Sequence, residues 1–182
     1  MALLSKNDIL DALKRLGELA LESGYEVDLL AVGGTVMVLS YGTRQATHDI
    51  DAIILAPETA SIVRQFAQDV AQELDWPEDW LNDGAKGFLV GMSENSILFS
   101  APGITLRRPA TPQLLAMKLS AWRDNVDIDD SEHLLRTLID EFSPAIDQDE
   151  IWTMVEPYLT PGDELKAKYA FLDLWETLYD TN

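Results

Sequence analysis

The sequence contains no cysteine and only two histidines, His48 and His133. Without cysteine the chain has no disulfide and no thiolate zinc site, and two histidines are too few for an ordinary zinc centre. Its uninterrupted apolar runs, such as residues 29–32 and 52–56, are far shorter than the ~20 residues that a membrane-spanning helix needs. Together these absences favour a cytoplasmic protein with no membrane segment.

Basic residues are also scarce. The chain has 13 Lys and Arg against 32 Asp and Glu, which gives a formal net charge of −19. Proteins that bind nucleic acid along an extended surface present clustered Lys and Arg, so we expect no such surface here. A single nucleotide that arrives with Mg²⁺ brings positive charge with it, so the composition does not exclude a nucleotide site.

The pattern of apolar residues predicts an α/β (α+β) fold in one compact unit. Hydrophobic residues make up 47% of the 182 residues, which is enough for an ordinary core. Residues 1–110 are expected to form a core with a small mixed sheet and packed helices, and residues 111–182 a helical part packed on that core. Within the core the pattern predicts helices at 5–24, 35–41 and 56–74, and strands at 27–32, 49–55, 87–91, 96–100 and 104–107.

Several helix starts carry capping signals. Ser5 and Asp8 resemble a capping box, and so do Asp147 and Glu150. One of the two aspartates at 129–130 is expected to cap the helix that follows them.

Two short motifs stand at the ends of neighbouring apolar runs. Gly33 and Gly34 follow one run, and Asp49 and Asp51 open the next. Alternate residues of a strand project to the same side, so the two carboxylates would lie about 6–7 Å apart, a spacing that suits a hard cation such as Mg²⁺. The glycine pair would let N–H groups at a helix start approach anionic oxygens. Each motif alone is also common as an ordinary strand start or turn.

Two basic residues are candidates for binding phosphate. Arg44 suits bidentate contact with phosphate oxygens, and Lys118 would act as a point charge. Lys118 is explained equally well as a helix residue whose ammonium reaches solvent. Three residues that follow it either form a network of polar contacts around Lys118 or belong to a solvated loop between helices with a helix cap: Arg123, Asp127 and Asp130.

At these residues the chain resembles the nucleotidyltransferase superfamily with the DNA polymerase beta-like fold. The core motif of that superfamily is Gly-Gly or Gly-Ser, followed by Asp-x-Asp on the next strand, and it is matched by Gly33, Gly34, Asp49 and Asp51. The similarity extends to small bacterial members related to AbiEii-type toxins and to an uncharacterised nucleotidyltransferase-like group. Their further motifs are matched, within residues 27–140, by Arg44, Thr47, Lys118, Leu119, Ala121, Arg123, Asp127 and Asp130.

This resemblance implies Mg²⁺-dependent transfer of a nucleotidyl group from a nucleoside triphosphate to a hydroxyl acceptor. It also implies a place in a toxin–antitoxin or phage-defence system, with an antitoxin-like protein as partner. The implied catalytic residues are Asp49, Asp51 and Lys118, of which the two aspartates hold the metal. The implied nucleotide-binding residues are Gly33, Gly34, Arg44 and Lys118.

One departure from the family pattern keeps a second interpretation open. Catalytic members carry a further acid on a later strand, where it acts as general base or metal ligand. The predicted strands at 96–100 and 104–107 contain no acid. The alternative is therefore a catalytically degenerate domain that works as a binding or regulatory protein, and the sequence leaves open whether the chain is an enzyme.

Overall fold

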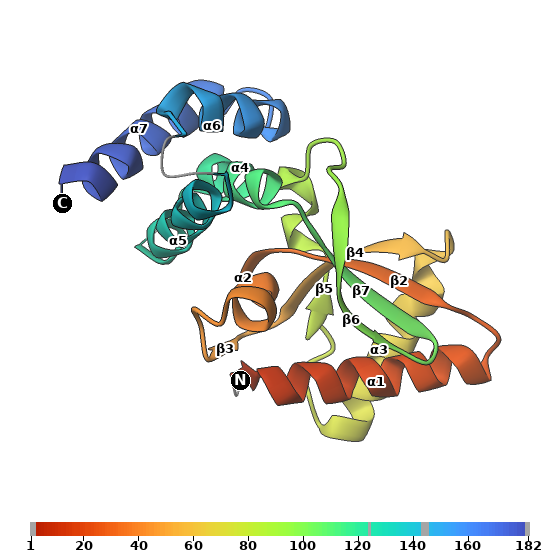
Figure 1. Ribbon diagram of the computed structural model, residues 1–182. Coiled ribbons are helices and arrows are strands. Elements are labelled where there is room, and N and C mark those ends of the chain that lie inside the picture. Colours follow the sequence, from red (N-terminus) through yellow and green to blue (C-terminus); the bar gives the residue numbers. More distant parts are fainter. Residues whose placement is uncertain (1–2, 124, 143–145, 181–182) are drawn as a thin grey trace. The chain divides into compact units, whose positions relative to one another are not determined.

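The computed structural model describes residues 3–123, 125–142 and 146–180, which form two compact units. The α/β unit comprises the described residues of Met1–Lys86 and Asn95–Arg108, and the helical unit those of Gly87–Glu94 and Pro109–Asn182. Figure 1 labels their helices and strands. The mixture of helices with a mixed sheet confirms the predicted fold class.

A mixed five-stranded sheet is the centre of the α/β unit. Its strand order is β5-β4-β2-β7-β6, and β1 and β3 pair separately as a small antiparallel sheet. Strand β2 runs antiparallel to β4 and parallel to β7, and β5 runs parallel to β4. In chain order the elements are β1 (Leu4–Ser5), α1 (Lys6–Glu22), β2 (Val27–Ala31), α2 (Gly33–Val36), η1 (Met37–Tyr41), β3 (Ala46–Thr47), β4 (Ile50–Ala56), α3 (Ala60–Leu74), β5 (Leu81–Asn82), η2 (Gly84–Phe88), β6 (Asn95–Ala101) and β7 (Ile104–Pro109).

Helices α1 and α3 pack against each other and against this sheet. The Arg15 guanidinium joins them by a two-pronged ion pair with Glu73, at 2.7 and 2.9 Å. Helix α1 also lies tight against the turn between β6 and β7 (Figure 1), because a Cβ on Gly17 would come within 2.5 Å of the carbonyl oxygen of Pro102. A side chain at position 17 would therefore push the helix off the sheet.

The helical unit is built around one buried helix. Helix α4 packs against α5, α6 and α7, and residues 113–120 of it are all buried, as expected for a helix that is apolar on most sides. None of the helices in the described ranges is both long and apolar enough to cross a membrane. The elements are α4 (Thr111–Ala121), α5 (Asn125–Phe142), α6 (Gln148–Val155), η3 (Glu156–Tyr158) and α7 (Glu164–Asp180).

Local signals in the sequence are partly confirmed. Both capping boxes form, at Ser5 with Asp8 and at Asp147 with Glu150. The cap predicted at 129–130 is wrong, because α5 already begins at Asn125 and these aspartates lie inside it. The strand predicted at 87–91 is also wrong: η2 is a 3-10 helix, and residues 89–91 form no strand.

Candidate functional site

The start of β4 meets the end of β2 and the start of β5, and this junction gathers the polar residues of the α/β unit that the sequence singles out. Asp51 is the second residue of β4, and Asp49 directly precedes the strand. The backbone N–H of Val32, at the end of β2, donates to the carbonyl of Asp51 at 2.9 Å. On the other side, β5 places Asn82 opposite Asp51 in the strand register. The glycine pair begins α2 immediately after Val32.

The Asp51 carboxylate lies between two glycines. A Cβ on Gly33 would stand 3.0 Å from Oδ2 of Asp51, and a Cβ on Gly84 would stand 3.6 Å from Oδ1. Gly33 also has φ +58°, a backbone conformation that other residues adopt only with strain. The backbone N–H of Asp51 donates to the hydroxyl oxygen of Thr35 at 3.1 Å. Glycine is therefore favoured at position 33 both for its backbone conformation and for the space that it leaves to the carboxylate.

Asp49 is held by a residue from the neighbouring strand. The Asn82 side-chain amide donates from Nδ2 to Oδ2 of Asp49 at 2.8 Å. Its other end, Oδ1, accepts from the backbone N–H of Gly84 at 2.8 Å. One side chain thus connects the first aspartate to the turn whose glycine lies beside the second aspartate.

The second glycine lies against the loop that carries Arg44. A Cβ on Gly34 would stand 2.6 Å from the hydroxyl oxygen of Thr47 and 3.5 Å from Nη1 of Arg44. Thr47 is buried and belongs to β3, so it has little room to move away. Helix α2 has only four residues before the chain widens into the π-helical segment η1. Any approach of an anion here would therefore depend on the backbone N–H groups of the glycines and on Arg44, rather than on the dipole of a long helix.

The donor set fits a magnesium ion that also binds phosphate oxygens. Among the described residues, no group of three or more His, Cys, Asp or Glu is placed to hold a metal ion. Mg²⁺ bound to a nucleotide commonly takes one or two protein carboxylates and completes its shell with phosphate oxygens and water. Asp49 and Asp51 supply two carboxylates at one strand start, which matches that requirement.

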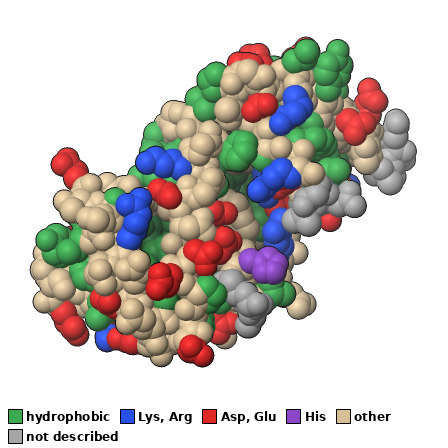
Figure 2. All heavy atoms as spheres, turned by 180° about the vertical axis from the view of Figure 1, so that it is seen from behind, with side chains coloured by type: hydrophobic (Ala, Val, Ile, Leu, Met, Phe, Trp, Pro, Cys, Tyr) green, Lys and Arg blue, Asp and Glu red, His purple; other side chains and the backbone are tan. Residues whose placement is uncertain are grey.

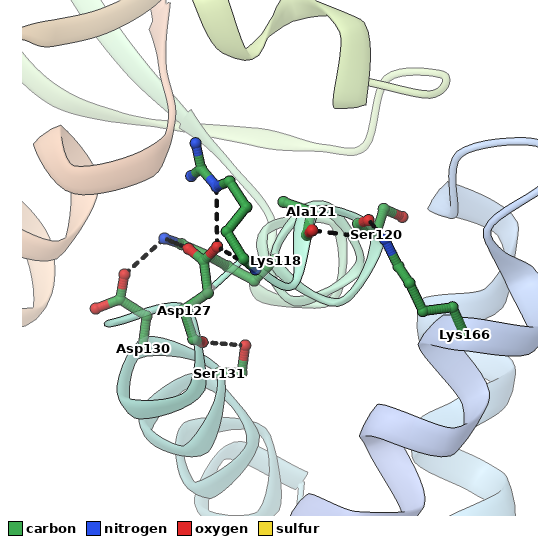
Figure 3. Close-up of polar contacts among 8 residues, drawn as sticks. Lys118, Ser120, Ala121, Asp127, Asp130, Ser131 and Lys166 are labelled. Carbon is green, nitrogen blue, oxygen red and sulfur yellow. Dashed lines mark hydrogen bonds and ion pairs between the residues drawn. The ribbon is translucent and has the colours of Figure 1, made fainter. Parts of the chain in front are cut away.

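Lys118 belongs to a buried ion cluster in the helical unit (Figure 3). Its Nζ lies 2.7 Å from Oδ1 of Asp127 and 2.7 Å from Oδ2 of Asp130. Arg123 donates to the other oxygen of Asp127, from its backbone N–H at 3.1 Å and from Nε at 3.0 Å. The three residues Lys118, Asp127 and Asp130 are 8%, 2% and 3% exposed. The cluster therefore pairs two cations with two anions, and three of the four side chains are out of water.

Burial and ion pairing act on the pKa of Asp127 in opposite directions. Burial by itself raises the pKa of this carboxyl, because it disfavours the charged form. The hydrogen bonds from Arg123 and Lys118 outweigh it and lower the pKa to about 2. Asp127 is therefore ionised at neutral pH.

The predicted site residues fall into two groups. Gly33, Gly34, Arg44, Asp49 and Asp51 meet at the junction in the α/β unit. The other four, which are Lys118, Arg123, Asp127 and Asp130, are brought together with one another in the helical unit. The sequence interpretation missed Asn82 and Gly84 as members of the junction. Their only signal was the Asn-Asp-Gly stretch at 82–84, which reads as a turn.

Comparison with known proteins identifies one family. The family model described as "Nucleotidyl transferase of unknown function (DUF2204)" matches residues 6–98, just over half of the chain. That stretch includes all the residues of the junction, and Lys118 lies beyond it. Comparisons with curated proteins and with solved structures find no match.

Proposed function

Because the chain belongs to this family of nucleotidyl transferases of unknown function, we propose that it transfers a nucleotidyl group from a nucleoside triphosphate to a hydroxyl acceptor. The observation that carries the proposal is the arrangement around the two aspartates. Asp51 lies against Gly33, and Asp49 is fixed by Asn82 at the same strand start. Two oriented carboxylates beside the glycine pair that begins α2 suit a triphosphate that carries a divalent cation.

Each residue of the junction has a part in this proposal. Asp49 and Asp51 would hold Mg²⁺, which, when bound, neutralises charge on the phosphates. Gly33 and Gly34 begin α2, so their backbone N–H groups would donate to phosphate oxygens, and the planar group of donors of Arg44 lies next to Gly34. Together these residues would orient the α-phosphate for attack by the acceptor hydroxyl, which loses its proton as the bond to the β-phosphate breaks and pyrophosphate leaves. Lys118 stays a prediction for nucleotide binding, since the contacts that it makes in the structure are those of the ion cluster.

The charge of the molecule bears on the acceptor. The net charge is −19, and the described Lys and Arg on the face in Figure 2 stand singly or in small groups among Asp and Glu. Long-range repulsion of this kind opposes a long RNA, so a protein or a small molecule is the favoured acceptor. Sequence resemblance alone supports a place in a toxin–antitoxin or phage-defence pair with an antitoxin-like protein.

Thermal unfolding with and without Mg²⁺ tests the proposal. Each of the four ribonucleoside triphosphates is added to the wild type and to the double variant Asp49→Asn, Asp51→Asn. A ligand at 100 times its Kd should stabilise the fold by about 2.7 kcal/mol. We expect a stabilisation that requires Mg²⁺ in the wild type and disappears in the double variant. Equal stabilisation of both proteins, or none with any triphosphate, contradicts the proposal.

A second candidate is a binding or regulatory protein with a degenerate site. It is favoured by the lack of a third acid next to Asp49 and Asp51 among the described residues, and β6 and β7 carry no acid. A general base typically contributes about 10²–10⁴-fold to a rate, so its loss would leave binding with little turnover. Triphosphates labelled at the α-phosphate separate the candidates. Label that becomes covalently attached to an acceptor in a cell extract indicates transfer, whereas tight binding without attachment indicates the degenerate protein.

A further inference from the structure

Asn82 has a place in the junction that its sequence context does not suggest. It lies in the two-residue strand β5, thirty-three positions after Asp49, and its amide donates to Oδ2 of that residue at 2.8 Å. The same side chain accepts from the backbone N–H of Gly84, and Gly84 lies next to Oδ1 of Asp51. Asn82 thus contacts the first aspartate directly and orders the turn beside the second.

The position of Asn82 is fixed by buried structure behind it. Trp80 is fully buried, and its indole N–H donates to the carbonyl of Ala67 in α3 at 2.8 Å. The carbonyl of Trp80 accepts from the backbone N–H of Ile50 at 2.6 Å, which locks the start of β5 onto the start of β4. The Asn82 amide is therefore held next to Asp49 by a strand whose start is fixed to β4 and, through Trp80, to α3.

The hydrogen bond decides which part of Asp49 remains for a metal ion. A carboxylate has about four lone-pair sites over its two oxygens, and the amide occupies one of them on Oδ2. The bond fixes the rotation of the carboxylate, as outer hydrogen bonds do for metal ligands in general. Asparagine fixes the Asp49 carboxylate without adding a negative charge. The junction therefore has two carboxylates, where an aspartate at position 82 would make three.

We propose that Asn82 is a positioning residue that orients Asp49 for the metal and makes metal binding depend on the nucleotide. This inference rests on the proposed function, since it concerns the same two carboxylates. With only two carboxylates a magnesium ion needs phosphate oxygens to complete its shell. An acid at position 82 would give a third carboxylate beside Asp49, and the ion would then bind without nucleotide.

Three variants test the inference by binding, with no need for activity: Asn82→Ala, Asn82→Asp and the matched control Asn95→Ala. Asn95 begins β6, at the opposite edge of the sheet from β5. Mn²⁺ is the probe, and its affinity is measured by electron paramagnetic resonance, alone and with non-hydrolysable α,β-methylene analogues of the four triphosphates. Urea unfolding of each variant reports whether it is folded.

In the presence of the analogue that the wild type binds, Asn82→Ala should bind Mn²⁺ about 10–100-fold more weakly, the usual cost of losing an outer-shell partner. Asn95→Ala should match the wild type. Asn82→Asp should bind Mn²⁺ without nucleotide at least tenfold more tightly than the wild type does. It should also be stabilised against urea by Mg²⁺ alone, which the wild type is not.

Two results overturn the inference. One is a folded Asn82→Ala protein that binds Mn²⁺ with nucleotide within twofold of the wild type. The other is an Asn82→Asp protein that gains no affinity for Mn²⁺ alone. Both leave the proposed function standing as long as the wild type binds Mn²⁺ with nucleotide. If the wild type binds no Mn²⁺ with any analogue, that result contradicts the proposed function, and it also contradicts this inference, which rests on that function.

Discussion

The Lys118 ammonium lies 2.7 Å from Oδ1 of Asp127, and both side chains are almost wholly buried. Asp130 makes the same contact with the ammonium from one turn further along α5. Buried charges of this kind persist only when each has a partner, because an unpaired ion in a dry interior costs several kcal/mol. The pair therefore ties α4 to α5 whether or not Lys118 also contacts a nucleotide.

Replacing Lys118 by methionine should destabilise the protein by about 3–5 kcal/mol, because it leaves Asp127 and Asp130 buried without their shared cation. Urea unfolding measures the change. The matched control is Lys14→Met, at a lysine that is half exposed and paired with Asp11 on the surface. The control should change stability by no more than about 0.5 kcal/mol. A loss below about 1 kcal/mol in Lys118→Met would remove the structural role of this cluster.

Acid should weaken the protein through Asp127. Its pKa in the folded state is about 2, against an ordinary value of 3.8, so the unfolded chain takes up a proton at a higher pH than the folded one does. The stabilisation is complete above about pH 5 and is lost progressively as the pH falls toward 2; the shift corresponds to roughly 2 kcal/mol. Unfolding free energies of the wild type and Asp127→Asn, measured from pH 5 to pH 2, should converge over that window. A constant difference over the window would show that Asp127 does not carry this dependence.

The sequence predicts the parts of the fold that are set by neighbouring residues. The capping boxes at Ser5 and Asp147 depend on residues three positions away, so they can be read directly from the chain. The two-residue strands β1, β3 and β5 could not be predicted, because two residues show no periodicity. The strand predicted at 87–91 is wrong because a short apolar run is compatible with several structures, and packing decides among them.

The same limit applies to the candidate site. Gly33 and Asp51 stand eighteen positions apart, and the family resemblance implies that they share one site. A Cβ on Gly33 would stand 3.0 Å from Oδ2 of Asp51, so the two residues do lie side by side. The part played by Asn82 depends on β5 lying parallel to β4 in one particular register. Nothing local to 82–84 specifies that register, since it is fixed by the burial of Trp80 behind the strand. Long-range pairing of this kind is a property of the folded core and has no local signature.

Alanine at position 33 should damage the site more than it damages the fold. The residue has φ +58°, which costs an L-amino acid about 1–2 kcal/mol, and its Cβ would come within 3.0 Å of Oδ2 of Asp51. Gly42 offers a matched control, since it has φ +64° and nothing within 4 Å of the position of its Cβ. Gly33→Ala and Gly42→Ala should therefore lose similar amounts of stability in urea, because the backbone strain is the same. Only Gly33→Ala should lose the stabilisation by triphosphate with Mg²⁺, because only there is a carboxylate of the proposed metal site displaced. If both variants keep that stabilisation, or both lose it, the closeness of Gly33 to Asp51 has no specific part in binding.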